Sequence, residues 1–304
     1  MPNTYDLIII GAGPGGITAA VYAARKGLKL LVITKDIGGQ AALSGNVENY
    51  TGYQFVPGPQ LAAKFEEHLR KFNFELKESE AVKEVKCENS GYIRIKTDKG
   101  IYAAKTAIIA TGARWKELNA LGEREFKNRG LTYCATCDGP LFRDKTVAVI
   151  GGGNSALDAA IQLINIATHV YIINIASNIT GDRIMQEKVA KNKKVTIFNN
   201  SRVAAISGDK FVNAIVVKRG GKEEKISVQG VFVEIGLNPN SEIIPNIEKN
   251  KKGEIEIDKD NHTSIPGIFA AGDVTDVSEK QIIIAAGEGA KAALSAFKYL
   301  TRQA

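Results

Sequence analysis

A short apolar strand that runs into a glycine-rich turn and then into a helical pattern occurs twice in this chain of 304 residues. The first copy is residues 5–10 followed by GAGPGG at residues 11–16, and the second is residues 146–150 followed by GGGNSA at residues 151–156. Another apolar strand follows each helical pattern, which makes a βαβ unit, the setting in which glycines at this spacing carry meaning. Such a turn brings the backbone close to a pyrophosphate at the helix N-terminus. The sequence therefore predicts two dinucleotide-binding folds.

The order of the remaining elements indicates how the two folds are connected. Helices are expected at residues 17–26, 55–71, 156–166 and 281–300, and strands at residues 28–34, 92–96, 107–113, 170–175, 231–236 and 268–271. The strand before Gly272 and Asp273 must return to the first core, so the second fold is inserted into the first. We predict an α/β protein with two Rossmann-like (three-layer ββα) domains. Residues 1–113 and 243–304 form the first domain, and residues 114–242 form the second.

Two cysteines separated by two residues, Cys134 and Cys137, lie just ahead of the second glycine-rich turn, and Asp138 follows directly. A pair at this spacing forms a small disulfide that accepts and gives up an electron pair readily. A zinc site is the alternative, but the chain has one CxxC and no His/Cys pair spaced to complete four ligands. No metal is therefore expected. A redox dithiol between two dinucleotide folds points to a disulfide reductase.

Composition limits the cellular locations and the kinds of partner that are expected. With 44% hydrophobic residues the chain can bury two cores, and three cysteines do not make a disulfide framework, so a reducing cytoplasm is expected. Apolar runs are too short for a membrane span, and no secretory signal is visible. The net charge of +7 is scattered and lacks interleaved aromatics, which disfavours nucleic acid and leaves an acidic protein partner open. Cys87 is expected to be a small, partly buried residue at a strand end.

Six motifs occur in an order and spacing that match one family over nearly the whole chain. They are GAGPGG, GGQ at residues 38–40, ATGA at 110–113, CATCDG at 134–139, GGGNSA and AAGDV at 270–274. The chain resembles the low-molecular-weight, bacterial-type thioredoxin reductases. The resemblance implies an FAD domain split between the two ends of the chain and a central pyridine-nucleotide-type domain that carries the dithiol. It also implies a homodimer with thioredoxin as the protein substrate.

The same resemblance assigns flavin-binding residues. Gly11, Gly13 and Gly16 would hold the FAD pyrophosphate, and Asp273 would hold the ribityl chain, although a turn role is the alternative for Asp273. Gln281 and Ile282 would face the pyrimidine edge of the flavin. The other positions implied to bind FAD are Pro14, Thr34, Gly39, Gln40, Asn49, Ala110, Thr111, Gly112 and Gly272. For Gln40 and Asn49 a loop-stabilising amide is an equal alternative.

The resemblance also implies a division of labour at the dithiol. Cys137 corresponds to the sulfur next to the flavin, and Cys134 would attack the disulfide of thioredoxin before Cys137 resolves the mixed disulfide. A departing thiolate needs a general acid, and the three histidines of the chain lie far from the dithiol in sequence. Asp138 is adjacent and matches the family acid. Its alternative role is a helix cap.

One stretch departs from the family. The basic cluster HRRxxxR that reads the NADPH 2′-phosphate is replaced, and its arginine positions fall on Ile175, Ala176 and Thr180. An acid that would suit NADH is also missing, because Asn174 stands at the strand end. The chain in this respect resembles the ferredoxin-dependent flavin thioredoxin reductases, and the positive charge fits an acidic ferredoxin. The alternatives are an NADPH-dependent enzyme with an altered pocket and a non-catalytic flavin and dithiol redox sensor.

Overall fold

The computed structural model describes residues 4–44, 46–88 and 91–303, and it divides the chain into two compact units. Unit 1 comprises Met1–Arg114 and Asn238–Ala304, and unit 2 comprises Trp115–Leu237. Two short strands, β9 (Ala113–Trp115) and β18 (Leu237–Pro239), carry the chain across this division. The predicted fold class, two Rossmann-like domains with the second inserted into the first, is confirmed.

Unit 1 is built on a seven-stranded sheet in the order β5-β2-β1-β8-β7-β6, and β19 pairs with the C-terminal end of β8. Its strands are β1 (Thr4–Ala12), β2 (Leu30–Ile37), β5 (Glu75–Lys77), β6 (Val82–Cys87), β7 (Ile93–Thr97), β8 (Ile101–Ile109) and β19 (Ile268–Ala270). The strands β5, β2, β1, β8 and β19 run parallel, whereas β6 and β7 are antiparallel additions. The parallel pairing of β19 with β8 returns the C-terminal part of the chain to the first core.

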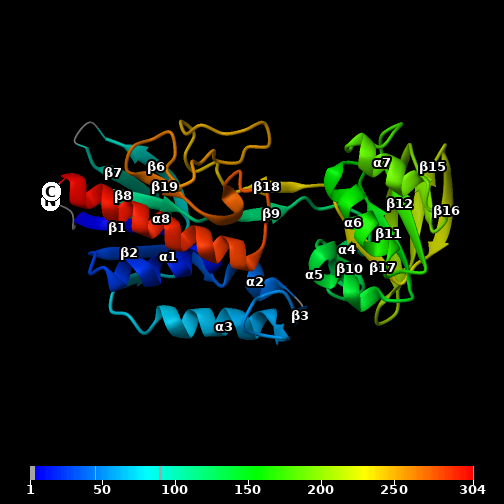
Figure 1. Ribbon diagram of the computed structural model, residues 1–304, viewed down its shortest axis with the longest axis horizontal. Coiled ribbons are helices and arrows are strands. Elements are labelled where there is room, and N and C mark those ends of the chain that lie inside the picture. The colour runs from blue at the N-terminus through cyan, green and yellow to red at the C-terminus, as the bar shows by residue number, and fades with distance from the viewer. Residues whose placement is uncertain (1–3, 45, 89–90, 304) are drawn as a thin grey trace. The chain divides into compact units, whose positions relative to one another are not determined.

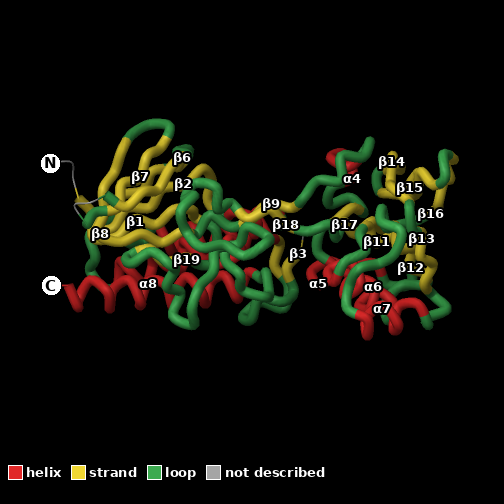
Figure 2. The backbone as a smooth tube through the Cα atoms, turned by 90° about the horizontal axis from the view of Figure 1, so that it is seen from above, coloured by secondary structure: helices red, strands yellow, loops and turns green. Residues whose placement is uncertain are grey.

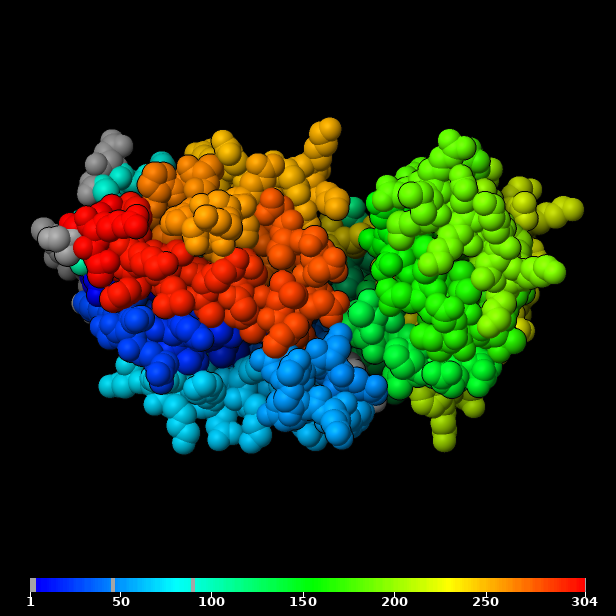
Figure 3. Space-filling model, viewed as in Figure 1, coloured from blue at the N-terminus to red at the C-terminus, as the bar shows by residue number. Residues whose placement is uncertain are grey.

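Helices cover one face of this sheet (Figure 1). They are α1 (Pro14–Arg25), α3 (Gly58–Leu69) and α8 (Ile282–Gln303). Unit 1 also contains the short helices α2 (Gly39–Leu43) and η2 (Gly272–Val274) and the short strands β3 (Asn46–Val47) and β4 (Val56–Pro57). The surfaces of α1 and α8 lie side by side in Figure 3, coloured blue and red. A Cβ on Gly289 of α8 would come 2.0 Å from the carbonyl oxygen of Gly15, so glycine is what lets the two helix backbones approach.

Unit 2 has three layers. A parallel five-stranded sheet, β10-β17-β11-β12-β13, lies between a helical layer and a three-stranded antiparallel sheet (Figure 2). The parallel strands are β10 (Leu131–Thr132), β11 (Thr146–Ile150), β12 (His169–Ile173), β13 (Val195–Phe198) and β17 (Gly230–Val233), and the antiparallel ones are β14 (Ser201–Gly208), β15 (Val212–Arg219) and β16 (Lys222–Ser227). The helices are α4 (Glu123–Phe126), α5 (Ala135–Asp138), η1 (Gly139–Phe142), α6 (Asn154–Ile164) and α7 (Arg183–Ala190).

Some predicted boundaries differ from the observed ones. Residues 238–242 belong to unit 1 rather than to the inserted unit, because Asn240 hydrogen-bonds to Thr111 and Gly112 there. The helix expected from residue 55 begins at Gly58, since residues 56 and 57 pair with β3. Cys87 is exposed rather than partly buried. Within the described residues, none of the helices has the length and apolar character that crossing a bilayer requires.

Candidate active site

The first glycine-rich turn leaves the N-terminus of α1 open. Gly11 has a φ of 102°, and a Cβ there would lie 2.3 Å from the carbonyl oxygen of Ala110, so the turn can close only around glycine. Gly16 is restricted in the same way by the carbonyl of Gly11 at 1.9 Å. Around Gly13, the N-cap that precedes Pro14, no described atom lies within 4 Å of a Cβ position. This open approach to backbone N–H groups fits a pyrophosphate.

The polar side chains expected around the flavin form hydrogen bonds within unit 1. The buried hydroxyl of Thr34 accepts from the backbone N–H of Ala12 at 3.2 Å and donates to the carbonyl of Asp36. Gln40 donates through Nε2 to the carbonyl of Ala113 at 2.6 Å.

The side chain of Asn49 donates through Nδ2 to Oε1 of Gln281 at 3.0 Å. The structure thus shows the loop-stabilising role for Gln40 and Asn49, and their contact with flavin stays a prediction. Gly39 is the first residue of α2, and a Cβ there would lie 3.2 Å from the Cα of Gly13.

The strand ends that face the first turn come from both parts of unit 1. After β8, Ala110 donates to Ile10, and the hydroxyl of Thr111 donates to the carbonyl of Asn240 at 2.7 Å. Gly112, with a φ of 65°, accepts from the backbone N–H of Asn240 at 3.0 Å. The residues after β8 are therefore held by the segment that returns from unit 2.

Asp273 follows β19 in the short helix η2, directly after Gly272. Burial raises the pKa of this carboxyl, and the positive charge of Lys280 opposes the shift. A buried carboxyl is stabilised by hydrogen-bond donors, and hydroxyl groups of a ribityl chain would supply them. Gln281 precedes α8, and Ile282 packs against the small cluster around Val47, Val56 and Leu61. Together with the open first turn, this end of unit 1 fits FAD.

The two cysteines of unit 2 form a disulfide at the start of α5, with their Cα atoms 5.3 Å apart. Cys134 is the N-cap of the helix, and its Sγ accepts from the backbone N–H of Cys137 at 3.2 Å. The short strand β10 leads directly into this turn, so the dithiol lies at the carboxyl edge of the parallel sheet. Binding sites of open α/β sheets occur at this edge.

Asp138 is tied to the same turn through a threonine. The hydroxyl of Thr132 accepts from the backbone N–H of Cys134 at 3.2 Å and donates to the Asp138 carboxylate. Burial raises the pKa of Asp138, which favours its protonated form. Although Asp138 precedes η1, its side chain makes no cap hydrogen bond to that helix. The structure thus shows no cap hydrogen bond from Asp138 to η1, and the role of Asp138 as a general acid stays a prediction.

Residues that follow β12 pack against Gly152 in the second glycine-rich turn. Asn174 is buried, and its amide bonds Asn199 at 2.9 Å and both backbone groups of Ala176 at 3.2 Å. A Cβ on Gly152 would lie 2.4 Å from the Asn174 Oδ1. The backbone N–H of Thr180 donates to the carbonyl of Gly152 at 2.7 Å. The second turn is therefore packed at Gly152, whereas the space beside Gly153 is open.

The positions that would read a 2′-phosphate carry no fixed cation. Ile175 is 77% exposed, and Thr180 faces the glycine turn through its backbone. Arg183, the nearest arginine, forms an exposed pair with Glu187 at 3.2 Å on α7. One exposed guanidinium does not replace an arginine cluster.

A second carboxyl near the dithiol was not anticipated from the sequence. Glu234 follows β17, and its Oε1 accepts from the backbone N–H of Ala135 at 3.3 Å. Burial raises its pKa to about 7, and the charge of Asp158 adds to the shift. An acid directly after an apolar strand is a signal that could have found it, because the carboxyl ends of parallel strands meet at one edge.

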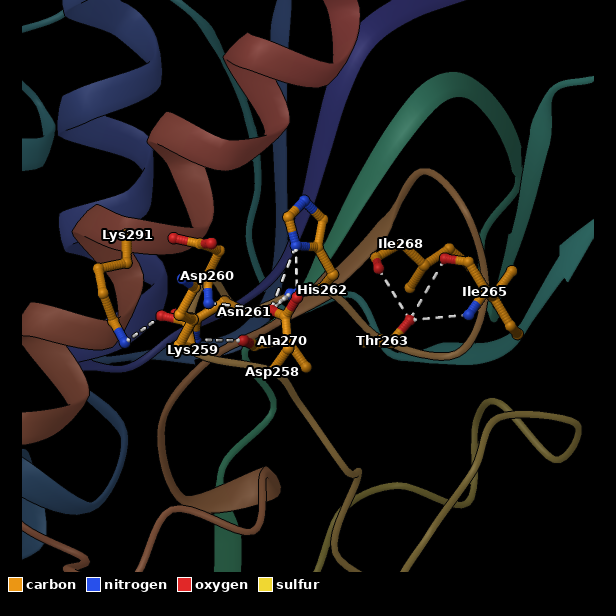
Figure 4. A network of polar contacts seen from close by, with 10 residues as sticks. All are labelled: Asp258, Lys259, Asp260, Asn261, His262, Thr263, Ile265, Ile268, Ala270 and Lys291. Atoms are coloured by element: carbon orange, nitrogen blue, oxygen red, sulfur yellow. Dashed lines mark hydrogen bonds and ion pairs between the residues drawn. The ribbon is translucent and has the colours of Figure 1, made fainter.

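A group of possible metal ligands occurs in a loop of unit 1 (Figure 4). Asp258, Asp260 and His262 are all exposed, and the His262 Nδ1 lies 3.0 Å from the Asp258 Oδ2. The Asp258 carboxylate also accepts from the backbone N–H groups of Asp260 and His262 at 2.9 Å. These hydrogen bonds stabilise a surface loop, and they explain why the three side chains lie together.

Comparison with known proteins identifies the class of protein. Residues 5–289 match the family described as pyridine nucleotide-disulphide oxidoreductase. The chain belongs to this family, and FAD is its cofactor.

Its relatives and structural neighbours are oxidoreductases of related kinds. Over 302 residues it is 43% identical to an NADH dehydrogenase from Bacillus subtilis, covering 98% of this chain and 59% of that protein. Over 307 residues it is 43% identical to a subunit of the alkyl hydroperoxide reductase of Pseudomonas aeruginosa, covering 99% and 59%. The chain thus spans about three fifths of the length of these relatives.

Two solved structures align with nearly the whole chain. Thioredoxin reductase from Streptococcus pyogenes has a TM-score of 0.93 and 37% identity, covering 99% of this chain and 100% of that one. A ferredoxin-flavin thioredoxin reductase from Clostridium acetobutylicum has a TM-score of 0.54 and 28% identity, covering 98% and 99%. The chain therefore has the fold of a thioredoxin-reductase-like flavoprotein disulfide oxidoreductase.

Proposed function

We propose that this protein is a thioredoxin reductase that uses the Cys134–Cys137 pair to reduce the disulfide of thioredoxin. The observation that carries the proposal is the disulfide at the carboxyl edge of the unit 2 sheet, next to the buried carboxyl of Asp138. The similarity to the S. pyogenes enzyme over the full length of both chains supports it. FAD, when bound, supplies the electron pair that converts the disulfide to the dithiol.

The residues of unit 2 then have distinct tasks. The Cys134 thiolate attacks one sulfur of the thioredoxin disulfide, which forms a mixed disulfide and releases the other sulfur as a thiolate. Asp138 gives that thiolate a proton, for which its raised pKa suits it. Cys137 then attacks Cys134 and releases the second sulfur of thioredoxin, which takes up the proton that the Cys137 thiol loses. The protein returns to its disulfide form, and thioredoxin has gained two electrons and two protons.

Reduced ferredoxin is the donor that the second glycine-rich turn favours. The buried side chain of Asn174 is held by hydrogen bonds to Ala176 and Asn199, and it offers no carboxylate to the hydroxyls of a ribose. The 2′-phosphate positions hold Ile175, Ala176 and Thr180. A net charge of +7 attracts small acidic carriers. The similarity to a ferredoxin-flavin thioredoxin reductase is further support.

A pyridine nucleotide is the second candidate donor, and one observation favours it. The B. subtilis relative, at 43% identity, is named an NADH dehydrogenase. That relative is longer than this chain, which covers 59% of it. In this case NADH or NADPH would bind through contacts other than a strand-end acid or an arginine cluster. A non-catalytic redox sensor is the remaining alternative, and it predicts no turnover with any donor.

One experiment separates these candidates. The FAD-loaded protein is mixed anaerobically with reduced ferredoxin, NADH or NADPH, each with and without thioredoxin, and flavin absorbance and thioredoxin thiols are followed. We expect ferredoxin to bleach the flavin and to support thiol formation at a rate that falls with added salt. Rapid bleaching by micromolar NADH or NADPH contradicts the ferredoxin proposal. Bleaching without thioredoxin thiols contradicts the reductase proposal itself.

The assembly and location of the protein are proposals of the same kind. We propose a homodimer, as the resemblance to thioredoxin reductases implies, and a cytoplasmic location, as three cysteines in 304 residues suggest. Sedimentation of the FAD-loaded protein tests the dimer. A monomer at micromolar concentration would contradict it.

A further inference from the structure

Two carboxyl groups flank the short helix that begins at the disulfide. Asp138 is its last residue and is bonded to Thr132, whereas Glu234 reaches its first turn from the end of β17. Glu234 Oε1 accepts the backbone N–H of Ala135, the residue next to Cys134, at 3.3 Å. The mechanism given above uses the first carboxyl and leaves the second without a task.

The backbone fixes Glu234 in this position. Its N–H donates to the carbonyl of Ile150 at 2.8 Å, which continues the pairing of β17 with β11 past the strand end. A Cβ on Gly151 would lie 2.3 Å from the Glu234 carbonyl oxygen, so the glycine turn packs directly against this residue. The side chain therefore projects from a rigid sheet edge and not from a mobile loop.

We propose that Glu234 is a positioning residue of the dithiol, which holds the first turn of α5 and whose charge controls how readily Cys134 forms a thiolate. The inference rests on the proposed role of Cys134 as the attacking sulfur. A thiolate is the form that attacks a disulfide, and a nearby negative charge disfavours it. A neutral Glu234 permits the thiolate, whereas an ionised Glu234 opposes it.

The surroundings of Glu234 place the ionisation of its carboxyl near neutral pH. Burial is the largest cause that raises the pKa of Glu234 to about 7, and Asp158 on α6 acts in the same direction. The N–H of Ala135 on α5 opposes the shift. Two further charged groups near this sheet edge are Asp138, bonded to Thr132, and Lys116, whose Nζ would lie 3.7 Å from a Cβ on Gly236. Near neutrality the carboxyl is thus divided between its two forms.

The test measures the acidity of Cys134 directly. In the Cys87→Ser, Cys137→Ser background, Cys134 is the one cysteine left of three. Its alkylation by iodoacetamide is followed by mass spectrometry from pH 5 to 10 in the FAD-loaded protein. Glu234→Gln keeps an oxygen that can accept from Ala135 and removes the charge. We expect this change to lower by about one unit the thiol pKa that the parent shows above pH 7, where its Glu234 is ionised, and to raise the thiolate fraction only about twofold at pH 7.

Glu224→Gln is the matched control, because it makes the same chemical change at an exposed position on β16. Coincident pH profiles for Glu234→Gln and its parent overturn the proposal, as does an equal shift in the control. If Glu234→Gln does not fold, the parent still decides, since it must show an inflection near pH 7 besides that of the thiol. No donor or thioredoxin enters the measurement, so its outcome is separate from that of the proposed function.

Discussion

The two glycine-rich turns have similar backbone conformations and differ in the residues that surround them. Gly11 and Gly151 have φ angles of 102° and 139°, and in each a Cβ would lie 2.3 Å from a carbonyl oxygen after a neighbouring strand. Gly13 and Gly153 are both extended N-caps with open space beside them. A strand, a tight turn and a close-packed helix therefore account for the glycines in both halves.

The position between these glycines separates the two turns. It is Ala12 in unit 1, and it is Gly152 in unit 2, where a Cβ would lie 2.4 Å from Oδ1 of Asn174. The second turn thus needs an additional glycine because a buried amide from the next strand end lies against it. Glycine spacing therefore specifies the turn, whereas the residue after the second strand determines which side chain lies against it.

The largest expected effect tests whether unit 2 contributes through its dithiol. Cys134→Ser and Cys137→Ser should each abolish thioredoxin reduction and leave FAD bound, because the electron pair has no acceptor in unit 2. Thioredoxin thiols and the flavin spectrum are the two measurements. Cys87→Ser, at the exposed cysteine of β6, should keep full activity. Residual turnover in either active-site variant would remove that sulfur from the pathway.

The next effect concerns the acid beside the dithiol. Asp138→Asn should slow thioredoxin turnover by a factor on the order of a hundred, a common loss for a general acid, while the flavin is still bleached by its donor. Steady-state and single-turnover rates separate these two steps. Asp144→Asn, the same change just after η1, serves as the control. Equal rates in the Asp138 variant and the parent would show that another group supplies the proton.

A matched pair of substitutions tests the comparison of the turns. Gly13→Val fits the extended backbone and fills the space assigned to the pyrophosphate, so FAD affinity should fall roughly tenfold or more. Gly153→Val makes the same change in the second turn and should leave FAD binding and ferredoxin-driven turnover unchanged. Fluorescence titration of the apoprotein with FAD gives the affinities. Flavin reduction by NADH or NADPH in the parent that is lost in the Gly153 variant alone would indicate a nucleotide at the second turn.

The smallest effect on function is expected at Glu234, whose carbonyl packs against the second turn, and the change there is measured as stability. The Glu234 carboxyl keeps its proton up to about pH 7 in the folded protein, whereas the unfolded chain releases it near pH 4.5. The folded state therefore binds more protons in this window, and its stability falls as pH rises. Glu234→Gln should stabilise the protein by about 1–3 kcal/mol at pH 8 and by little at pH 4. Urea unfolding at both pH values measures it, and an equal change at both would contradict the raised pKa.

The sequence predicted those parts of the fold that depend on local chemistry. Both βαβ turns, the dithiol and the return of the last strand were found, since glycines and apolar runs act within a few residues. Roles that depend on distant partners were missed. Glu234 meets Ala135 only because β10 and β17 are neighbours in the sheet, and the burial of Asn174 depends on Asn199, 25 residues further on.

The antiparallel layer of unit 2 was also missed. The strand β16 reads KEEKIS, in which four charged residues conceal the one buried position, Ile226. Its pairing with β15 is what makes it a strand. Alternation of apolar and polar residues is too weak a signal in so short a charged segment.

The close contact of α1 with α8 has a consequence for protein synthesis. A nascent chain that has reached Leu237 holds every residue of unit 2, which can fold at the ribosome while β19 and α8 do not yet exist. Until α8 is made, the α1 face around Gly15 lacks its covering helix, and Asp273 has not joined the end of the sheet near the first glycine-rich turn. The dithiol unit is thus expected to mature before unit 1, and any ligand that needs the complete unit 1 would bind only after α8 is translated.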